Sequence, residues 1–311
     1  MADVAPPRDT RDLGRASRRV VALAKVFVIA MENHDASEIY GDTGDARYMH
    51  DVLMRTWAHA TRFSDELPIS IPSEPHYVWM EAGQSAFSDH VFTGDADPSA
   101  SNSTASTLHL STQIEASGAR VTWRSYQEGL DFATGACPVT SSGFYVAKHD
   151  PFVFFQDVTG QPPSAGNARC ASHHRAYSAF ARDLAASDVA SYTFITPNVC
   201  HDMHGGPGCA NPNLVQSADE WLSAELPRII AYARENAGVI FLTWDEGNAT
   251  DKMPFFAIGP EVKRGYTGSV LYNHGSLVKS VEEILHLPVL PAVSGDNDLS
   301  DLFVGGLLAQ Q

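Results

Sequence analysis

The chain has 311 residues, of which 44% are hydrophobic and 19% are charged, so it can bury a substantial core. No run approaches the roughly 18 consecutive apolar residues that a membrane span needs, and we expect no integral membrane segment. The formal net charge of −16 argues against nucleic acid as a partner, because that binding depends on Lys and Arg neutralising phosphate. A phosphorylated substrate would need a local positive centre, most simply a metal ion held by carboxylates.

The N-terminal residues 1–24 are expected to form a flexible lead-in, since they open with the polar stretch MADVAPPRDTRDLGRAS. The following stretch RRVVALAKVFVIA has the basic start and apolar body of a signal peptide. However, Lys25 interrupts it and a small-residue cleavage site is missing. We therefore interpret its second half as a buried strand.

Four short apolar runs bounded by turn residues predict strands, and each is apolar on both faces, as in a covered parallel sheet. They are KVFVIAM at 25–31, SYTFITP at 191–197, AGVIFLTW at 237–244 and MPFFAIG at 253–259. Helical patterns lie between or after them, at 107–118, 178–187, 217–238 and 275–288. This alternation predicts an α/β fold, layered α/β/α with a mostly parallel central sheet.

Two stretches rich in Gly, Pro, Ser and Asn predict loops, at residues 92–106 and 156–170. Neither is long enough to separate two domains. We expect residues 25–311 to form a single domain.

Four cysteines are present: Cys137, Cys170, Cys200 and Cys209. None lies in a CxxC pair of the kind that binds zinc or exchanges thiols. Pairing Cys137 with Cys170 and Cys200 with Cys209 would close two local loops, but the sequence does not fix the connectivity, and buried free thiols are the alternative. Disulfides would indicate a secreted or periplasmic protein.

Acidic, asparagine and histidine residues follow three predicted strands or stand at the start of the last helix. They are Glu32, Asn33, Asp202, His204, Asp245, Glu246 and His274. Ligands of open α/β sheets bind beyond the carboxyl ends of the strands. Buried carboxylates are costly unless they are paired, hydrogen-bonded or bound to metal. One such residue is explained as a cap or an ion-pair partner, but the whole set predicts a metal site at one edge of the sheet.

Ser73 lies between two prolines in the stretch ISIPSEPHYVWMEAG, residues 69–83. The pattern predicts a loop and then a helix, with Ser73 as the N-cap and Pro75 in the first turn. Capping alone would explain the serine. A helix N-terminus also stabilises negative charge on a serine oxygen and on a neighbouring phosphate, so a nucleophile is the second interpretation.

Several motifs together resemble a known family. They are MENHDASEIYG, PSEPHYVWMEAG, WRSYQE, YVAKHDPFVFF, FITPNVCHDMHGG, LTWDEG, YNHGSLVKSVEEILHLP and GDNDLSDLF. These motifs follow one another along the chain in the same order as in the phosphoesterase family of acid phosphatases and phospholipases C. The sequence therefore resembles that family, which has the alkaline-phosphatase-like fold. The secreted acid phosphatases of mycobacteria are the most similar group.

The resemblance implies a metal-dependent phosphomonoesterase with Ser73 as the nucleophile and a phosphoserine intermediate that water hydrolyses. Glu32, Asn33, Asp245 and Glu246 would bind one or two divalent ions. The resemblance does not distinguish among Mg, Mn, Zn and Ca. The resemblance also places four further side chains in the pocket: His204, His274, Asp202 and His149. They would hold phosphate, protonate the leaving oxygen or bind a second metal ion.

His76 departs from the family pattern, which usually has an asparagine there that donates to a phosphoryl oxygen. We expect His76 to contact the substrate. The reaction rate, the pH optimum or the preferred substrate should then differ from those of family members with asparagine at this position. Expected partners are a small phosphorylated substrate or a phospholipid headgroup.

Two other functions stay open. A phospholipase C or another phosphodiesterase shares the metal chemistry, although the phospholipases of the family carry longer chains with extra C-terminal domains. A non-catalytic ligand-binding relative is supported by His76 alone. An α/β-hydrolase is disfavoured, because the chain has no G-x-S-x-G elbow.

Overall fold

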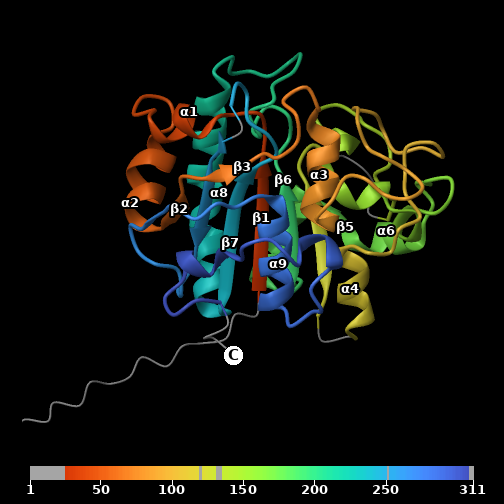
Figure 1. Ribbon diagram of the computed structural model, residues 1–311. Coiled ribbons are helices and arrows are strands. Elements are labelled where there is room, and N and C mark those ends of the chain that lie inside the picture. The colour runs from red at the N-terminus through yellow and green to blue at the C-terminus, as the bar shows by residue number, and fades with distance from the viewer. Residues whose placement is uncertain (1–24, 119–120, 131–134, 251, 308–311) are drawn as a thin grey trace, which may run out of the picture.

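A sheet of eight strands runs through the centre of the protein (Figure 1). This computed structural model describes residues 25–118, 121–130, 135–250 and 252–307, so the lead-in predicted at residues 1–24 lies outside the described part. The strand order is β10-β2-β9-β7-β1-β6-β4-β5. In chain order the strands are β1 (Lys25–Met31), β2 (Ala58–Ala60), β4 (Trp123–Gln127), β5 (His174–Ala176), β6 (Tyr192–Thr196), β7 (Gly238–Trp244), β9 (Phe255–Ile258) and β10 (Thr267–Gly268). A separate pair joins β3 (Phe63–Ser64) to β8 (Lys252–Met253).

Five neighbouring strands, β7, β1, β6, β4 and β5, run parallel to one another. Strand β9 is antiparallel to both β7 and β2. The predicted mostly parallel sheet is confirmed, although the run at 253–259 divides between β8 and the antiparallel β9. Strands β1 and β7 pair along their whole length, so Met31 lies opposite Trp244 and their carboxyl ends are level.

Helices lie in front of the sheet and behind it, with α9 on the near side and α8 on the far side in Figure 1. The helices are α1 (Ala36–Tyr40), α2 (Met54–Thr56), α3 (Ser73–Ala82), α4 (Leu110–Ala116), α5 (Gln156–Thr159), α6 (Ala168–His173), α7 (Phe180–Ala185), α8 (Leu214–Glu235) and α9 (His274–Ile284). Shorter π or 3-10 turns are Met49–Leu53, Ala147–His149, Pro151–Phe154, Tyr177–Ala179, Pro291–Val293 and Leu299–Leu302. In the described part of the chain, none of the helices is both long and apolar enough to cross a bilayer.

The four helices predicted between or after the strands are present as α4, α7, α8 and α9, and the helix predicted to start at Ser73 is α3. Helix α8 begins before the predicted residue 217, because the Asn213 side chain accepts a hydrogen bond from the Gln216 amide and caps it. Residues 92–106 form the predicted loop. The loop predicted at 156–170 is wrong in part, since α5 and the start of α6 lie within it.

Both predicted disulfides are present, and the free-thiol alternative is wrong. Cys137 pairs with Cys170 and Cys200 pairs with Cys209, with Cα atoms 5.2 and 5.3 Å apart. The second disulfide closes a short loop directly after β6.

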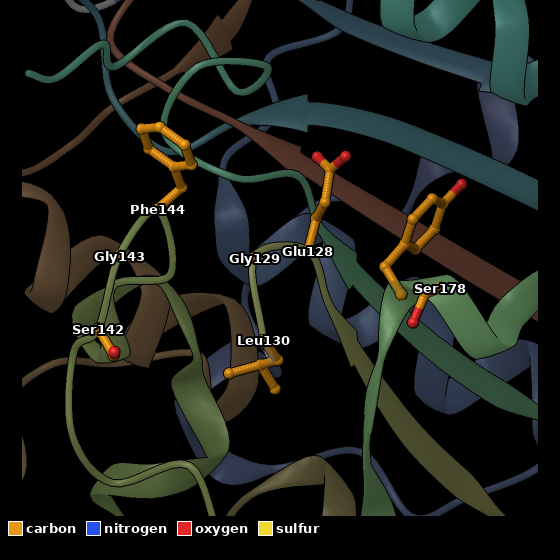
Figure 2. A pocket seen from close by; sticks show the side chains of 8 residues that line it. Glu128, Gly129, Leu130, Ser142, Gly143, Phe144 and Ser178 are labelled. Carbon is orange, nitrogen blue, oxygen red and sulfur yellow. The ribbon is translucent and has the colours of Figure 1, made fainter. Parts of the chain in front are cut away.

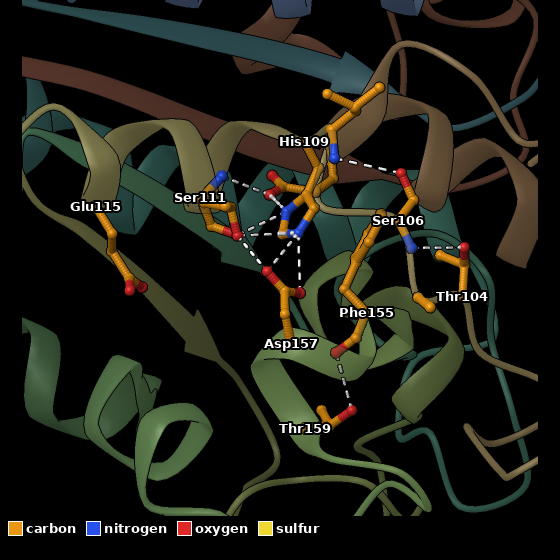
Figure 3. Close-up of polar contacts among 12 residues, drawn as sticks. Thr104, Ser106, His109, Ser111, Glu115, Phe155, Asp157 and Thr159 are labelled. Atoms are coloured by element: carbon orange, nitrogen blue, oxygen red, sulfur yellow. Dashed lines mark hydrogen bonds and ion pairs between the residues drawn. The ribbon is translucent and has the colours of Figure 1, made fainter.

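A buried charged network ties helix α3 to α4 and α5 (Figure 3). His109 Nδ1 lies 3.0 Å from a carboxylate oxygen of Glu81, at the end of α3, and Nε2 lies 3.1 Å from Asp157 in α5. Burial opposes a charge on His109, but the hydrogen bonds to Asp157 and Glu81 outweigh it and raise its pKa. The imidazolium therefore joins two carboxylates from different helices, and this fixes the far end of α3.

Replacing His109 with alanine should destabilise the fold strongly, because it leaves Glu81 and Asp157 without their cation. We expect the free energy of unfolding to fall by about 3–5 kcal/mol in urea denaturation, the usual cost of breaking a buried pair. The matched control is His50→Ala, at a partly exposed ion pair with Asp51, which should change stability by no more than about 0.5 kcal/mol. Equally small effects of the two substitutions would contradict a stabilising role of the network.

Candidate active site

Four acidic residues meet where β1, β6 and β7 end. Glu32 follows β1, Asp245 and Glu246 follow β7, and Asp202 lies in the loop after β6. Backbone hydrogen bonds continue the sheet into this region: the Glu32 amide donates to the Asp202 carbonyl at 2.7 Å, and the Asp245 amide donates to Met31 at 2.9 Å. All four carboxylates are buried. The sheet therefore brings the predicted residues together as expected for neighbouring parallel strands.

Ser73 faces this carboxylate cluster from the start of α3. Its Oγ lies 3.1 Å from Glu32 Oε2 and 3.2 Å from Glu246 Oε1, and can donate to either. The prediction that Ser73 is the N-cap is wrong by one position: Pro72, in an extended conformation, is the cap, and Ser73 is the first helical residue. The hydroxyl is thus turned away from the helix backbone toward the carboxylates, at the positive end of a ten-residue helix.

Several oxygens of the cluster lack hydrogen-bond donors. Asp245 Oδ2 and Asn33 Oδ1 are buried and have no hydrogen-bond partner in the described part of the chain. Asn33 holds this position in the left-handed region at φ 40°, and its amide donates to Asp245 Oδ1 at 3.0 Å. Unpartnered buried acceptors of this kind fit a hard divalent cation, which prefers carboxylate and amide oxygens.

Electrostatics supports the same conclusion. Burial, followed by repulsion from Asp245, raises the pKa of Glu246 to about 8. Burial and the neighbouring Glu32 raise the pKa of Asp245 well above its ordinary value, and burial raises that of Glu32 as well. Without a cation these groups compete for protons; a divalent ion would let them ionise together.

A second group of possible ligands adjoins the first. His149 is buried between Glu32, 3.0 Å from Nε2, and Asp202, 3.2 Å from Nδ1, and its ring stacks on Tyr77. Burial lowers the pKa of His149 to about 4, so it is a neutral imidazole able to bind metal. Ligand atoms of Glu32, His149 and His204 lie within 4.8 Å of one another. A second cation could be held here.

The other two predicted histidines, His274 and His76, make hydrogen bonds to other groups around the cluster. His274 begins α9 and donates from Nε2 to the Asp245 carbonyl at 2.6 Å, so it supports the backbone of the cluster. His76 contacts Asp65 through Nε2 at 3.0 Å and the Pro72 carbonyl through Nδ1 at 2.9 Å. Burial opposes the charge on His76, but Asp65 outweighs it and raises the pKa to about 9. His76 is therefore a fixed cation beside the site, with both ring nitrogens occupied.

Two residues near the site were not predicted. Asp65, the partner of His76, follows the two-residue strand β3, which is too short to detect by periodicity. Lys148 directly precedes His149 and contacts His204 and Asp95. Its only signal was its place in the motif YVAKHDPFVFF.

A pocket of about 500 Å³ lies farther along the same edge of the sheet (Figure 2). Glu128, directly after β4, lines it together with Phe144 and Tyr177. The Glu128 carboxylate also binds His201 Nδ1 at 2.9 Å, next to Asp202. The pocket thus borders the disulfide-closed loop that carries Asp202 and His204.

Comparison with known proteins identifies relatives. A model described as the Phosphoesterase family matches residues 56–288. A phosphatidylinositol-3-phosphatase of Mycobacterium tuberculosis is 24% identical over 296 residues, which cover 94% of this chain and 86% of that protein. A probable acid phosphatase of Kluyveromyces lactis is 24% identical over 299 residues, with 90% and 62% covered. The chain thus spans less than two thirds of the yeast protein.

Solved structures share the fold. Murine ectonucleotide pyrophosphatase/phosphodiesterase 5 superposes with a TM-score of 0.58 at 12% identity, covering 90% of this chain and all of that one. A Vibrio parahaemolyticus protein of the alkaline phosphatase superfamily gives a TM-score of 0.56 at 11% identity, covering 90% and 70%. The expected alkaline-phosphatase-like fold is confirmed.

The metal-free protein should lose stability as the pH rises, partly through Glu246. A folded-state pKa of about 8, above the ordinary 4.5, means that the folded chain keeps a proton which the unfolded chain has lost. Stability therefore falls with pH between these values, by up to about 1.4 kcal/mol per pH unit. In chelator, urea unfolding from pH 5.5 to 8 should show a steeper decline for the wild type than for Glu246→Gln. The exposed Glu66→Gln should behave as the wild type, and equal slopes for wild type and Glu246→Gln would contradict the expectation.

Proposed function

Because the chain belongs to the Phosphoesterase family, we propose that it is a metal-dependent phosphomonoesterase, formed by one phosphoesterase domain, with Ser73 as its nucleophile. Its named relatives are phosphatases, and it is a hydrolase of phosphoric esters. The observation that carries the proposal is the position of Ser73 Oγ, between Glu32 and Glu246 at the N-terminus of α3.

The ligands of a divalent cation would be Glu32, Asn33, Asp245 and Glu246, whose buried oxygens fit one. When bound, the cation supplies Lewis-acid stabilisation of negative charge on the serine and phosphoryl oxygens. The chain itself orients the nucleophile: Pro72 fixes the entry to α3, and the two glutamates hold the hydroxyl toward the site. The helix dipole favours the anionic oxygen and the incoming phosphate.

In the first step, Ser73 gives its hydroxyl proton to Glu32 or Glu246, the two carboxylates that accept its hydrogen bond. A bond forms between Ser73 Oγ and phosphorus as the bond from phosphorus to the alcohol oxygen breaks. The departing oxygen takes a proton, for which we assign His204, the exposed imidazole of the set, positioned by its amide hydrogen bond to Asp202. A bond then forms between the oxygen of water and phosphorus as the bond from phosphorus to Ser73 Oγ breaks, which releases phosphate and returns a proton to Ser73. His149 and Asp202 either complete the proton path or hold a second ion, while His274 holds the Asp245 backbone.

We propose small phosphate monoesters or phosphorylated lipid headgroups as substrates. The second possibility is supported by the mycobacterial relative, which is named for a phosphoinositide phosphatase activity. The two disulfides support a secreted or periplasmic location, because such bonds persist in oxidising compartments.

Ser73→Ala should lower kcat for p-nitrophenyl phosphate by at least about 10³-fold, because no other group replaces the attacking oxygen. Radiolabelled phosphate should become bound to the wild-type protein in an acid-stable form, and the label should be absent from the variant. The control is Ser70→Ala, an exposed serine in the same loop, which should keep full activity. Unchanged hydrolysis by Ser73→Ala would exclude the proposed nucleophile.

Removal of divalent ions should abolish activity, since the carboxylate cluster cannot stabilise phosphate by itself. After chelation and dialysis, we expect a loss of at least about 10²-fold that one or more of Mg²⁺, Mn²⁺, Zn²⁺ and Ca²⁺ restores. Asp245→Asn should lower the metal content measured by plasma mass spectrometry, whereas Ser73→Ala should largely retain it. A fully active metal-free protein would contradict the proposal.

A further inference from the structure

One positive charge at the edge of this acidic site has no role in the mechanism above. Lys148 lies in the 3-10 turn that also carries His149. Its Nζ contacts the Asp95 carboxylate and lies 3.4 Å from His204 Nε2. In the described part of the chain, Lys148 is the lysine or arginine whose side chain contacts a proposed site residue, His204.

The Lys148 ammonium faces the carboxylate cluster. The side chain is 16% exposed, and its charge interacts with those of Glu32 and Asp245. These carboxylates repel an approaching dianionic phosphate. A cation bound by the proposed ligands would reduce this repulsion on its own side of the site. Lys148 offers a second positive centre from the side of His204.

The position of Lys148 is tied to the nucleophile. The Glu74 amide, directly after Ser73, donates to Asp95 Oδ1 at 3.0 Å, and the other oxygen of Asp95 binds the lysine. Asp95 thus bridges the first turn of α3 to Lys148. An ammonium has three donors, so one remains for a ligand when Asp95 and His204 each take one.

We propose that Lys148 binds a non-bridging phosphoryl oxygen and makes the site selective for phosphate monoesters over diesters. At neutral pH a monoester carries close to two charges over three terminal oxygens. A diester carries one charge over two, because a neutral ester oxygen replaces the third. The attraction to a fixed cation is therefore stronger for the monoester. This inference rests on the proposed phosphomonoesterase function and specifies its substrate class.

The test compares two esters with the same leaving group, p-nitrophenyl phosphate and methyl p-nitrophenyl phosphate. Lys148→Gln should lower kcat/KM for the monoester by about 10²-fold, within the range for losing one donor to a developing oxyanion. The diester should lose less than about threefold, and Lys148→Arg should recover part of the monoester rate. Lys252→Gln, at an exposed lysine on β8, is the matched control and should change neither rate.

Inorganic phosphate provides a second readout that does not need diester turnover. Its inhibition constant should rise about tenfold or more in Lys148→Gln. Asp95→Asn, which keeps the lysine but removes its anchor, should shift both measurements in the same direction by less. Metal content and thermal unfolding should match the wild type in the lysine variants.

The outcomes separate the two proposals. Equal losses for both esters in Lys148→Gln, or an unchanged inhibition constant for phosphate, would overturn the role of Lys148 while leaving the phosphatase function intact. A wild-type protein that hydrolyses neither ester with any of the four divalent ions would overturn both.

Discussion

Mutual repulsion among buried carboxylates is the constraint on which the site depends. Glu32, Asp202, Asp245 and Glu246 lie together at the ends of three adjacent strands, with little water to separate their charges. Such an arrangement is stable when protons or cations balance the charge, and the unpartnered Asp245 and Asn33 oxygens favour the second solution. The roles that we propose for the hydroxyl of Ser73, the neutral His149 and the ammonium of Lys148 all depend on this concentration of negative charge.

The fold creates this concentration through strand order. Strands β6, β1 and β7 are neighbours and parallel, so residues that follow them in separate parts of the sequence end at one edge. The strands are apolar on both faces and covered by helices, which keeps water from the carboxylates. Helix α3 then brings the serine to the same edge, while the Glu81–His109–Asp157 network fixes its other end.

The sequence predicted the elements with strong local patterns: the central strands, five helices including α3, the acidic strand ends and both disulfides. It did not predict β2, β4, β5 or β10, because these strands are short or mixed in polarity and are ordered by their neighbours in the sheet. The pairing of His76 with Asp65, and the bridge from Glu74 through Asp95 to Lys148, depend on residues distant in sequence. No periodicity encodes such contacts, so the spatial environment of His76 and Lys148 required the structure.

The two backbone hydrogen bonds that extend the sheet past β1 and β7 have a consequence for dynamics. The Glu32 amide donates to Asp202, and the Asp245 amide donates to Met31. Both amides thus belong to the ladder of the most buried strands, where amide hydrogens exchange with solvent chiefly through global unfolding. The amides of Glu32 and Asp245, at the base of the candidate site, should therefore be among the slowest-exchanging in the protein.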